Sequence, residues 1–160
     1  MKTFITTLLF SLICTITNAR DFDDVDIKVT KANANVYMLK GAGGNIGVLA
    51  TETGLLLVDD QFAQLAERIE SAMKSIVNKE LKYIVNTHFH GDHTGGNIEF
   101  GAESLIVAHE NVRMRMAASN QPAVALPVVT FDDDVTIHFN GEDITLIHMP
   151  NGHTDTDSVV

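Results

Sequence analysis

Cysteine is almost absent from this sequence of 160 residues, which also has no tryptophan and only three prolines. The single cysteine, Cys14, lies within an apolar segment near the N-terminus. We expect this segment to be removed from the mature protein, for the reasons given below. Disulfide bridges and thiolate metal ligands are therefore excluded within the mature chain.

Positive charge is also scarce. The chain has 11 lysine and arginine residues against 21 aspartate and glutamate residues, which gives a formal net charge of −10. The basic residues form no cluster, and an excess of negative charge repels phosphate backbones and anionic lipid. The composition therefore argues against a nucleic-acid partner.

The apolar run near the N-terminus is too short to cross a membrane. It covers residues 4–16, whereas a spanning helix needs about 20 apolar residues. It follows Lys2 and precedes the small residues 17–19, which is the arrangement of a secretory signal peptide. We predict that residues 1–19 are a cleaved signal peptide and that residues 20–160 form one domain. The protein is then secreted or periplasmic and has no stable membrane anchor.

The pattern of apolar residues beyond this segment predicts an α/β domain. Apolar positions at helical spacing predict a helix over residues 61–77, capped by Asp60, and a second helix is expected over 109–118. Unbroken or alternating apolar runs predict strands between the helices. The strands are predicted as two within 27–40, one each at 46–51, 55–60, 82–87 and 104–108, and a hairpin of 135–139 with 144–149. The glycine-rich residues 41–45 are interpreted as a turn or the rim of a site, because they lack the spacing of a phosphate loop.

The sequence NTHFHGDHTGG, residues 86–96, contains three of the seven histidines together with an aspartate. It begins where a predicted buried strand ends, and ligands bind at the carboxyl ends of strands in open α/β sheets. His88 and His90 are two positions apart in extended chain and point the same way, so they can meet on one ion. Asp92 and His93 would face a neighbouring point. The spacing favours two metal ions side by side, and the alternative is a solvated polar loop.

A further histidine must complete the ligands of the first ion. His153 follows a turn signal at the end of the predicted hairpin, an arrangement that repeats the first segment. His109, His138 and His148 occur without a motif, and we interpret each of them as structural.

These segments resemble the metallo-β-lactamase superfamily. The resemblance rests on THFHGDHTGGN as the metal loop, on NGHTDTDSVV as the later histidine segment, and on LLLVDD in place of the family's strand that ends in aspartate. It implies an αββα sandwich with one or two zinc ions at one edge, between the two sheets. The matching residues are His88, His90 and His153 for the first ion, Asp92 and His93 for the second, and Asp59 as a support for these ligands.

The resemblance also implies a metal-dependent hydrolase acting on a small-molecule substrate. Zinc lowers the pKa of its bound water to about 7 and polarises the scissile bond, so no protein nucleophile is needed. Asp92 would orient the resulting hydroxide and pass a proton to the leaving group. Secretion favours a β-lactam or another small ester or amide as the substrate. The alternatives are a thioesterase of the glyoxalase II type and a non-catalytic zinc-binding short form, and the sequence indicates no oligomeric state.

The family continues beyond the last motif with a further strand and more ligands for the second ion. Because the sequence stops at DSVV, we expect an N-terminal portion of a longer protein, the runner-up being a natural short form without activity. The sandwich would then be incomplete, with its second sheet and the helices of that sheet largely missing. We accordingly expect the second face of the strands 55–60 and 82–87 to be exposed.

Overall fold

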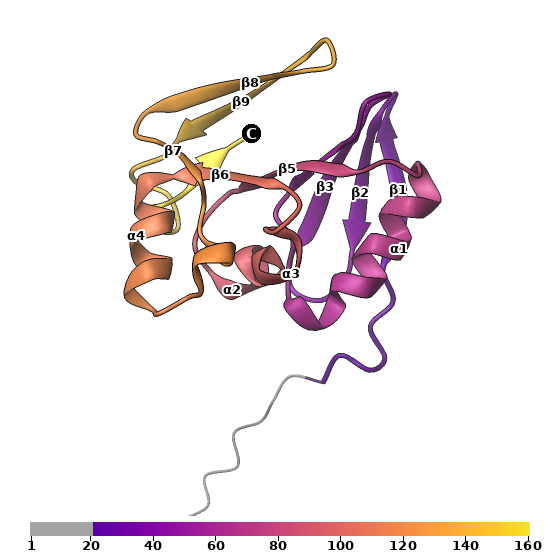
Figure 1. The fold of residues 1–160 in the computed structure, drawn as a ribbon, viewed down its shortest axis with the longest axis horizontal. Helices are drawn as coiled ribbons and strands as arrows, with labels where there is room; N and C mark the ends of the chain where they lie inside the picture. The colour runs from indigo at the N-terminus through magenta and orange to yellow at the C-terminus, as the bar shows by residue number, and fades with distance from the viewer. Residues whose placement is uncertain (1–20) are drawn as a thin grey trace, which may run out of the picture.

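The computed structural model describes residues 21–160, which begin with consecutive strands, continue with helices between strands, and end with consecutive strands (Figure 1). The expected signal peptide, residues 1–19, lies outside the described residues. Within the described part, no helix combines the length and the apolar character that crossing a membrane requires.

Seven strands of the described chain form one sheet, and their order in the sheet is their order in the sequence. The strands are β1 (Lys28–Asn33), β2 (Val36–Lys40), β3 (Asn45–Ala50), β4 (Leu55–Val58), β5 (Leu81–Asn86), β6 (Leu105–His109) and β7 (Val129–Phe131). The pairs from β1 to β4 are antiparallel, whereas those from β4 to β7 are parallel. Parallel neighbours need a crossover between them, and the helices occupy these crossovers. The carboxyl ends of β4, β5 and β6 therefore meet at one edge of the sheet.

The crossovers of the parallel half contain all the α-helices described. These are α1 (Ala66–Ile76), α2 (Gly91–Thr94), α3 (Asn97–Phe100) and α4 (Glu110–Ala118), with 3-10 turns at Ala63–Leu65 and Ala123–Ala125. Helix α1 buries Ile69, Ala72 and Met73, while Glu67 and Lys74 take the exposed side. The helix predicted over residues 61–77 is thus confirmed, although it begins later than predicted.

The prediction that Asp60 caps α1 is wrong. The helical segment begins only after Phe62 with the 3-10 turn Ala63–Leu65, and neither this turn nor α1 has a side-chain cap at its N-terminus. The carboxylate of Asp60 instead accepts a hydrogen bond from the backbone N–H of Gly96, 2.9 Å away. The residues between β4 and α1 are therefore used to bind the loop that follows β5 and not to start the helix.

Three strands form a second, antiparallel sheet in the order β10–β9–β8, counted within residues 21–160. They are β8 (Asp134–Phe139), β9 (Glu142–His148) and β10 (Ser158–Val159), so the predicted hairpin is confirmed. Its outward-facing side chains are polar pairs. Thr136 faces Thr145 at 2.9 Å between their hydroxyl oxygens, and His138 Nδ1 lies 2.6 Å from a carboxylate oxygen of Asp143.

The second sheet covers the face of the first sheet that α1 leaves open. Leu57 and Ile84 pack in the core beneath α1, whereas their neighbours Leu56 and Val85 pack on the other side with residues such as Leu146 of β9. Leu56 and Val85 are at most 1% exposed. The expectation that this face is exposed is therefore wrong, because the hairpin β8–β9 folds over it.

Candidate metal centre

Three of the predicted ligands converge at the edge where β5 ends. His88 and His90 belong to the loop between β5 and α2, and His153 lies in the loop between β9 and β10. Each offers one ring nitrogen, and these three atoms all lie within 4.8 Å of one another. The group joins segments that are 63 residues apart in the chain.

The spacing of one nitrogen pair matches that of two ligands on a tetrahedral ion. His153 Nε2 and His90 Nδ1 are 3.2 Å apart, and two ligand nitrogens bound to a tetrahedral zinc at 2.0–2.1 Å are separated by about 3.3 Å. Thr87 Oγ1 lies 3.2 Å from His88 Nδ1 and so leaves the other nitrogen of that ring for a ligand. The side chains of His88, His90 and His153 can therefore supply three ligands to one metal ion.

The loop that carries His153 is fixed by Asp157. Its carboxylate accepts hydrogen bonds from the backbone N–H of His153, at 2.6 Å, and from the N–H and hydroxyl of Thr154. A Cβ on Gly152 would lie 2.5 Å from Asp157 Oδ2, so only glycine leaves room for this turn. We did not predict Asp157 from the sequence; its place four residues after His153 was the available signal.

The same loop is hydrogen-bonded to the motif that carries His88 and His90. The hydroxyl of the buried Thr156 accepts from the backbone N–H of Phe89 at 3.2 Å, and the N–H of Ser158 donates to the carbonyl of Thr87 at 2.8 Å. These bonds lie directly beside the two ligands of the motif. They bring His153 next to His88 and His90 through the main chain.

Asp92 and His93 form a second group next to the first. His93 Nδ1 lies 2.7 Å from Asp59 Oδ2, and Asp59 also accepts from the N–H and the hydroxyl of Thr87, both at 2.7 Å. The carboxylate of Asp59 thus favours the proton on Nδ1 and leaves His93 Nε2 free, 3.6 Å from Asp92 Oδ2. Asp59 is buried at the place expected for a residue that supports the ligands.

Burial and charge act differently on the two groups. Burial, together with the nearby His93, lowers the pKa of His88 below its usual value. Burial also lowers the pKa of His93, but the hydrogen bond and charge of Asp59 and the charge of Asp92 outweigh it, so the net shift is upward. A metal ligand must offer an unprotonated nitrogen. Burial therefore favours the unprotonated form of His88, which is the form that a metal ligand requires.

Two glycines let the ligand motif approach the turn after β4. A Cβ on Gly95 would lie 2.6 Å from the carbonyl oxygen of Gln61, and a Cβ on Gly96 would lie 2.6 Å from that of Asp60. The turn itself is bent sharply, with positive φ at Asp59 (63°) and Gln61 (56°). The TGG that ends the motif is thus required by packing against this turn, and it contributes no ligand.

The other histidines lie apart from this cluster. The ring of His109 accepts from the backbone N–H of Asn111 and caps α4, and it stacks on His148 with ring centres 3.6 Å apart. His138 is an exposed residue of the hairpin β8–β9. These positions agree with the structural interpretation of all three.

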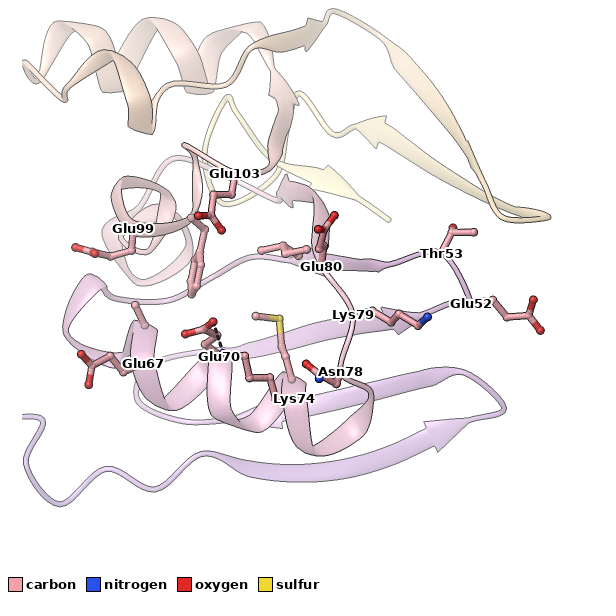
Figure 2. A pocket seen from close by; sticks show the side chains of 14 residues that line it. Glu52, Thr53, Glu67, Glu70, Lys74, Asn78, Lys79, Glu80, Glu99 and Glu103 are labelled. Carbon is pink, nitrogen blue, oxygen red and sulfur yellow. Dashed lines mark ion pairs between the residues drawn. The ribbon is translucent and has the colours of Figure 1, made fainter.

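A large hollow of the described chain lies elsewhere. It is a groove of about 1060 Å³ beside α1 with several glutamates on its walls, among them Glu67, Glu70, Glu80, Glu99 and Glu103 (Figure 2). No histidine lines it. The groove is therefore distinct from the place where the ring nitrogens of His88, His90 and His153 converge.

Comparison with known proteins identifies the family of this chain. The family model of the metallo-beta-lactamase superfamily matches residues 39–160. Beta-lactamase-like protein 2 homolog of Caenorhabditis elegans is 34% identical over 134 residues, which cover 82% of this chain and 43% of that protein. Hydroxyacylglutathione hydrolase of Prochlorococcus marinus (strain MIT 9301) is 30% identical over 79 residues, covering 49% of this chain and 30% of that protein. The chain thus spans less than half the length of either relative.

A solved structure shows the same fold. BJP-1, a subclass B3 metallo-beta-lactamase of Bradyrhizobium japonicum, superposes with a TM-score of 0.72 at 24% identity and covers 83% of this chain and 55% of that chain. The predicted fold class, the α/β metallo-β-lactamase sandwich, is confirmed.

Proposed function

Because the chain belongs to the metallo-beta-lactamase superfamily, we propose that it carries the metal site of a zinc-dependent hydrolase that cleaves a small ester or amide, including a β-lactam. The observation that carries this proposal is the convergence of ring nitrogens of His88, His90 and His153, which all lie within 4.8 Å of one another. Three imidazoles with an open fourth position are a ligand set of catalytic zinc sites.

The residues of the site would have separate roles in hydrolysis. Zinc held by the three histidines would polarise the scissile bond and lower the pKa of a water to about 7. Asp92 has a half-exposed carboxylate beside the cluster, where it would hold a proton and deliver it to the leaving group. His93, held by Asp59 with its Nε2 free, would serve with Asp92 as ligands of a second ion.

Thioester hydrolysis is the second candidate. It is favoured by the likeness to a hydroxyacylglutathione hydrolase, whose matched segment covers about half of this chain. We rank it below a β-lactam or another small ester or amide because residues 1–19 have the pattern of a secretory signal. For the same reason we propose a secreted or periplasmic location.

Substrate turnover with a metal test would decide between these candidates. The purified protein is assayed with a chromogenic cephalosporin and with a generic thioester, each with and without a chelator. We expect chelator-sensitive hydrolysis of the cephalosporin that zinc restores. His88→Ala should lose zinc by elemental analysis and lose turnover, whereas the matched change His138→Ala on the exposed hairpin should keep both.

Each result has a definite meaning. Turnover that is insensitive to chelator, or unchanged zinc content in His88→Ala, would contradict the metal assignment. Hydrolysis of the thioester alone would favour the second candidate. Stoichiometric zinc without turnover of either compound would indicate a non-catalytic zinc-binding protein.

A further inference from the structure

The side chain of Gln61 is fully buried beneath the glycine-rich loop, residues 41–45. Its amide nitrogen donates a hydrogen bond to the carbonyl of Gly44. At the other end of the loop, a Cβ on Gly41 would lie only 2.5 Å from Gln61 Oε1. The amide therefore touches both ends of the loop and occupies the space beneath it.

The upper side of the loop lies against the second ligand group. A Cβ on Gly44 would lie 3.3 Å from His93 Cε1 and 3.6 Å from His93 Nε2. A Cβ on Gly43 would lie 3.1 Å from Asp92 Cβ and 3.5 Å from Asp92 Oδ2. The main chain of Gly43 and Gly44 therefore lies beside Nε2 of His93, and we call this part of the loop the wall. Any side chain at Gly44 would press on the imidazole ring of His93.

Gln61 also holds the other flank of the ligand motif. Its backbone carbonyl accepts from the N–H of Gly96, 3.1 Å away, directly after the ligand helix α2. The residue makes these two connections from a left-handed backbone conformation, with φ of 56°, which non-glycine residues adopt only when surrounding contacts hold them there. One residue therefore links the loop before β3 to the end of the metal motif.

We propose that Gln61 is a positioning residue: its amide holds the glycine-rich loop against His93, and the loop wall sets how tightly the second ion is held. The metal part of this inference rests on the proposed function. The wall itself does not, since it concerns packing in the metal-free protein. The atoms nearest to a Cβ at Gly43 or Gly44 belong to Asp92, His93 and Phe62 and not to the first ligand group. The affinity of the first group should therefore be independent of the Gln61 side chain.

Chemical modification of the metal-free protein tests the wall. Gln61→Met keeps an unbranched side chain of similar length but cannot donate to Gly44. Diethyl pyrocarbonate modifies accessible imidazoles, and peptide mass spectrometry gives the rate at each histidine. We expect the rate at His93 to rise about fivefold, the change that loss of one ordinary hydrogen bond produces in a local opening equilibrium, while the rate at His138 stays constant. An unchanged rate at His93 would overturn the proposal.

Two further variants control this experiment. Gln121→Met makes the same change at an exposed position after α4 and should leave the rate at His93 unaltered. Gly44→Ala keeps Gln61 but adds a methyl group against His93, so it should slow modification of His93. If Gln61→Met does not fold, a rate in Gly44→Ala that equals that of the parent protein would still refute the wall.

Titration with Co²⁺, followed by its absorption spectrum, tests the metal part. In Gln61→Met we expect binding of the second ion to weaken about tenfold, the low end for residues that orient metal ligands, with the first ion unaffected. Equal weakening of both ions, or of neither, would overturn the proposed role. If the parent protein binds no second ion, the proposed second position fails together with the metal part, whereas the modification rates still decide the wall.

Discussion

The two ligand groups of the candidate site are built in different ways. His88, His90 and His153 come from two segments 63 residues apart and meet only because the loop after β9 binds to the motif after β5. Asp92 and His93 are neighbours in one short helix, and their support comes from Asp59 at the end of β4.

The first group thus depends on how its side chains are brought together, and the second on how the imidazole of His93 is oriented. The first group depends on a long-range docking that places a third imidazole, with Nε2 of His153 only 3.2 Å from Nδ1 of His90. Asp92 and His93 of the second group are brought together by the local sequence. This group depends on the distant carboxylate of Asp59 only for the tautomer of the His93 imidazole. Changes that affect docking should therefore weaken the first ion, and changes that affect Asp59 should weaken the second.

The largest effect is expected from Asp92→Asn. The amide keeps the shape of the side chain but cannot carry the proton, so hydrolysis should fall about 10²–10⁴-fold while the first ion remains bound. Steady-state kinetics and elemental analysis measure the two effects separately. Asp143→Asn makes the same change on the exposed hairpin and should be neutral, and full activity in Asp92→Asn would show that Asp92 is not the proton carrier.

Asp59→Asn should act on the second group alone. Asparagine has one acceptor oxygen where Asp59 uses two, and its NH₂ group would face His93 Nδ1 when the oxygen bonds the N–H of Thr87. The proton of His93 would then move to Nε2, the nitrogen required by the metal. We expect the affinity for the second ion to fall about 10–100-fold in a metal titration. Equal loss at both positions would contradict the separation of the two groups.

Asp157→Asn should show the opposite selectivity. One of the two backbone N–H groups of His153 and Thr154 would lose its acceptor, so the loop would hold His153 less firmly. Affinity for the first ion should fall about tenfold, with the second position unaffected. Asp155→Asn is a suitable control, because that exposed carboxylate lies in the same loop but pairs with Arg115.

The smallest effect concerns a histidine outside both groups. Burial, with the adjacent His148, lowers the pKa of His109 below 6.5, and protonation would also remove its acceptor for the N–H of Asn111. This contribution to stability is complete above the ordinary pKa and is lost as the pH falls through it. The free energy of unfolding in urea should therefore decrease between about pH 7.5 and pH 5.5. His109→Asn keeps a capping oxygen without titrating, so its slope should be shallower; identical slopes would refute this role.

Most of the layered core was predictable from the sequence because its signals are local. The helical spacing of Ile69, Ala72 and Met73 indicated α1, and the unbroken apolar run of β4 indicated a strand covered on both faces. Asp60 shows where local reasoning failed. A carboxylate before a helix is usually a cap, but here the chain turns first and the side chain reaches a backbone N–H that is 36 residues away.

The sequence by itself determined the family to which the chain belongs and indicated the candidate ligands and the pairing of His88 with His90, because short segments such as residues 86–96 contain these signals in consecutive positions. Only the tertiary structure decided the rest. It placed His153 beside His90, assigned Asp157 and Gln61 their supporting contacts, and closed β8 and β9 over the second face of the sheet. The physical reason is that hydrogen bonds and packing between distant segments have no period or spacing in the sequence, so they exist only once the chain has folded.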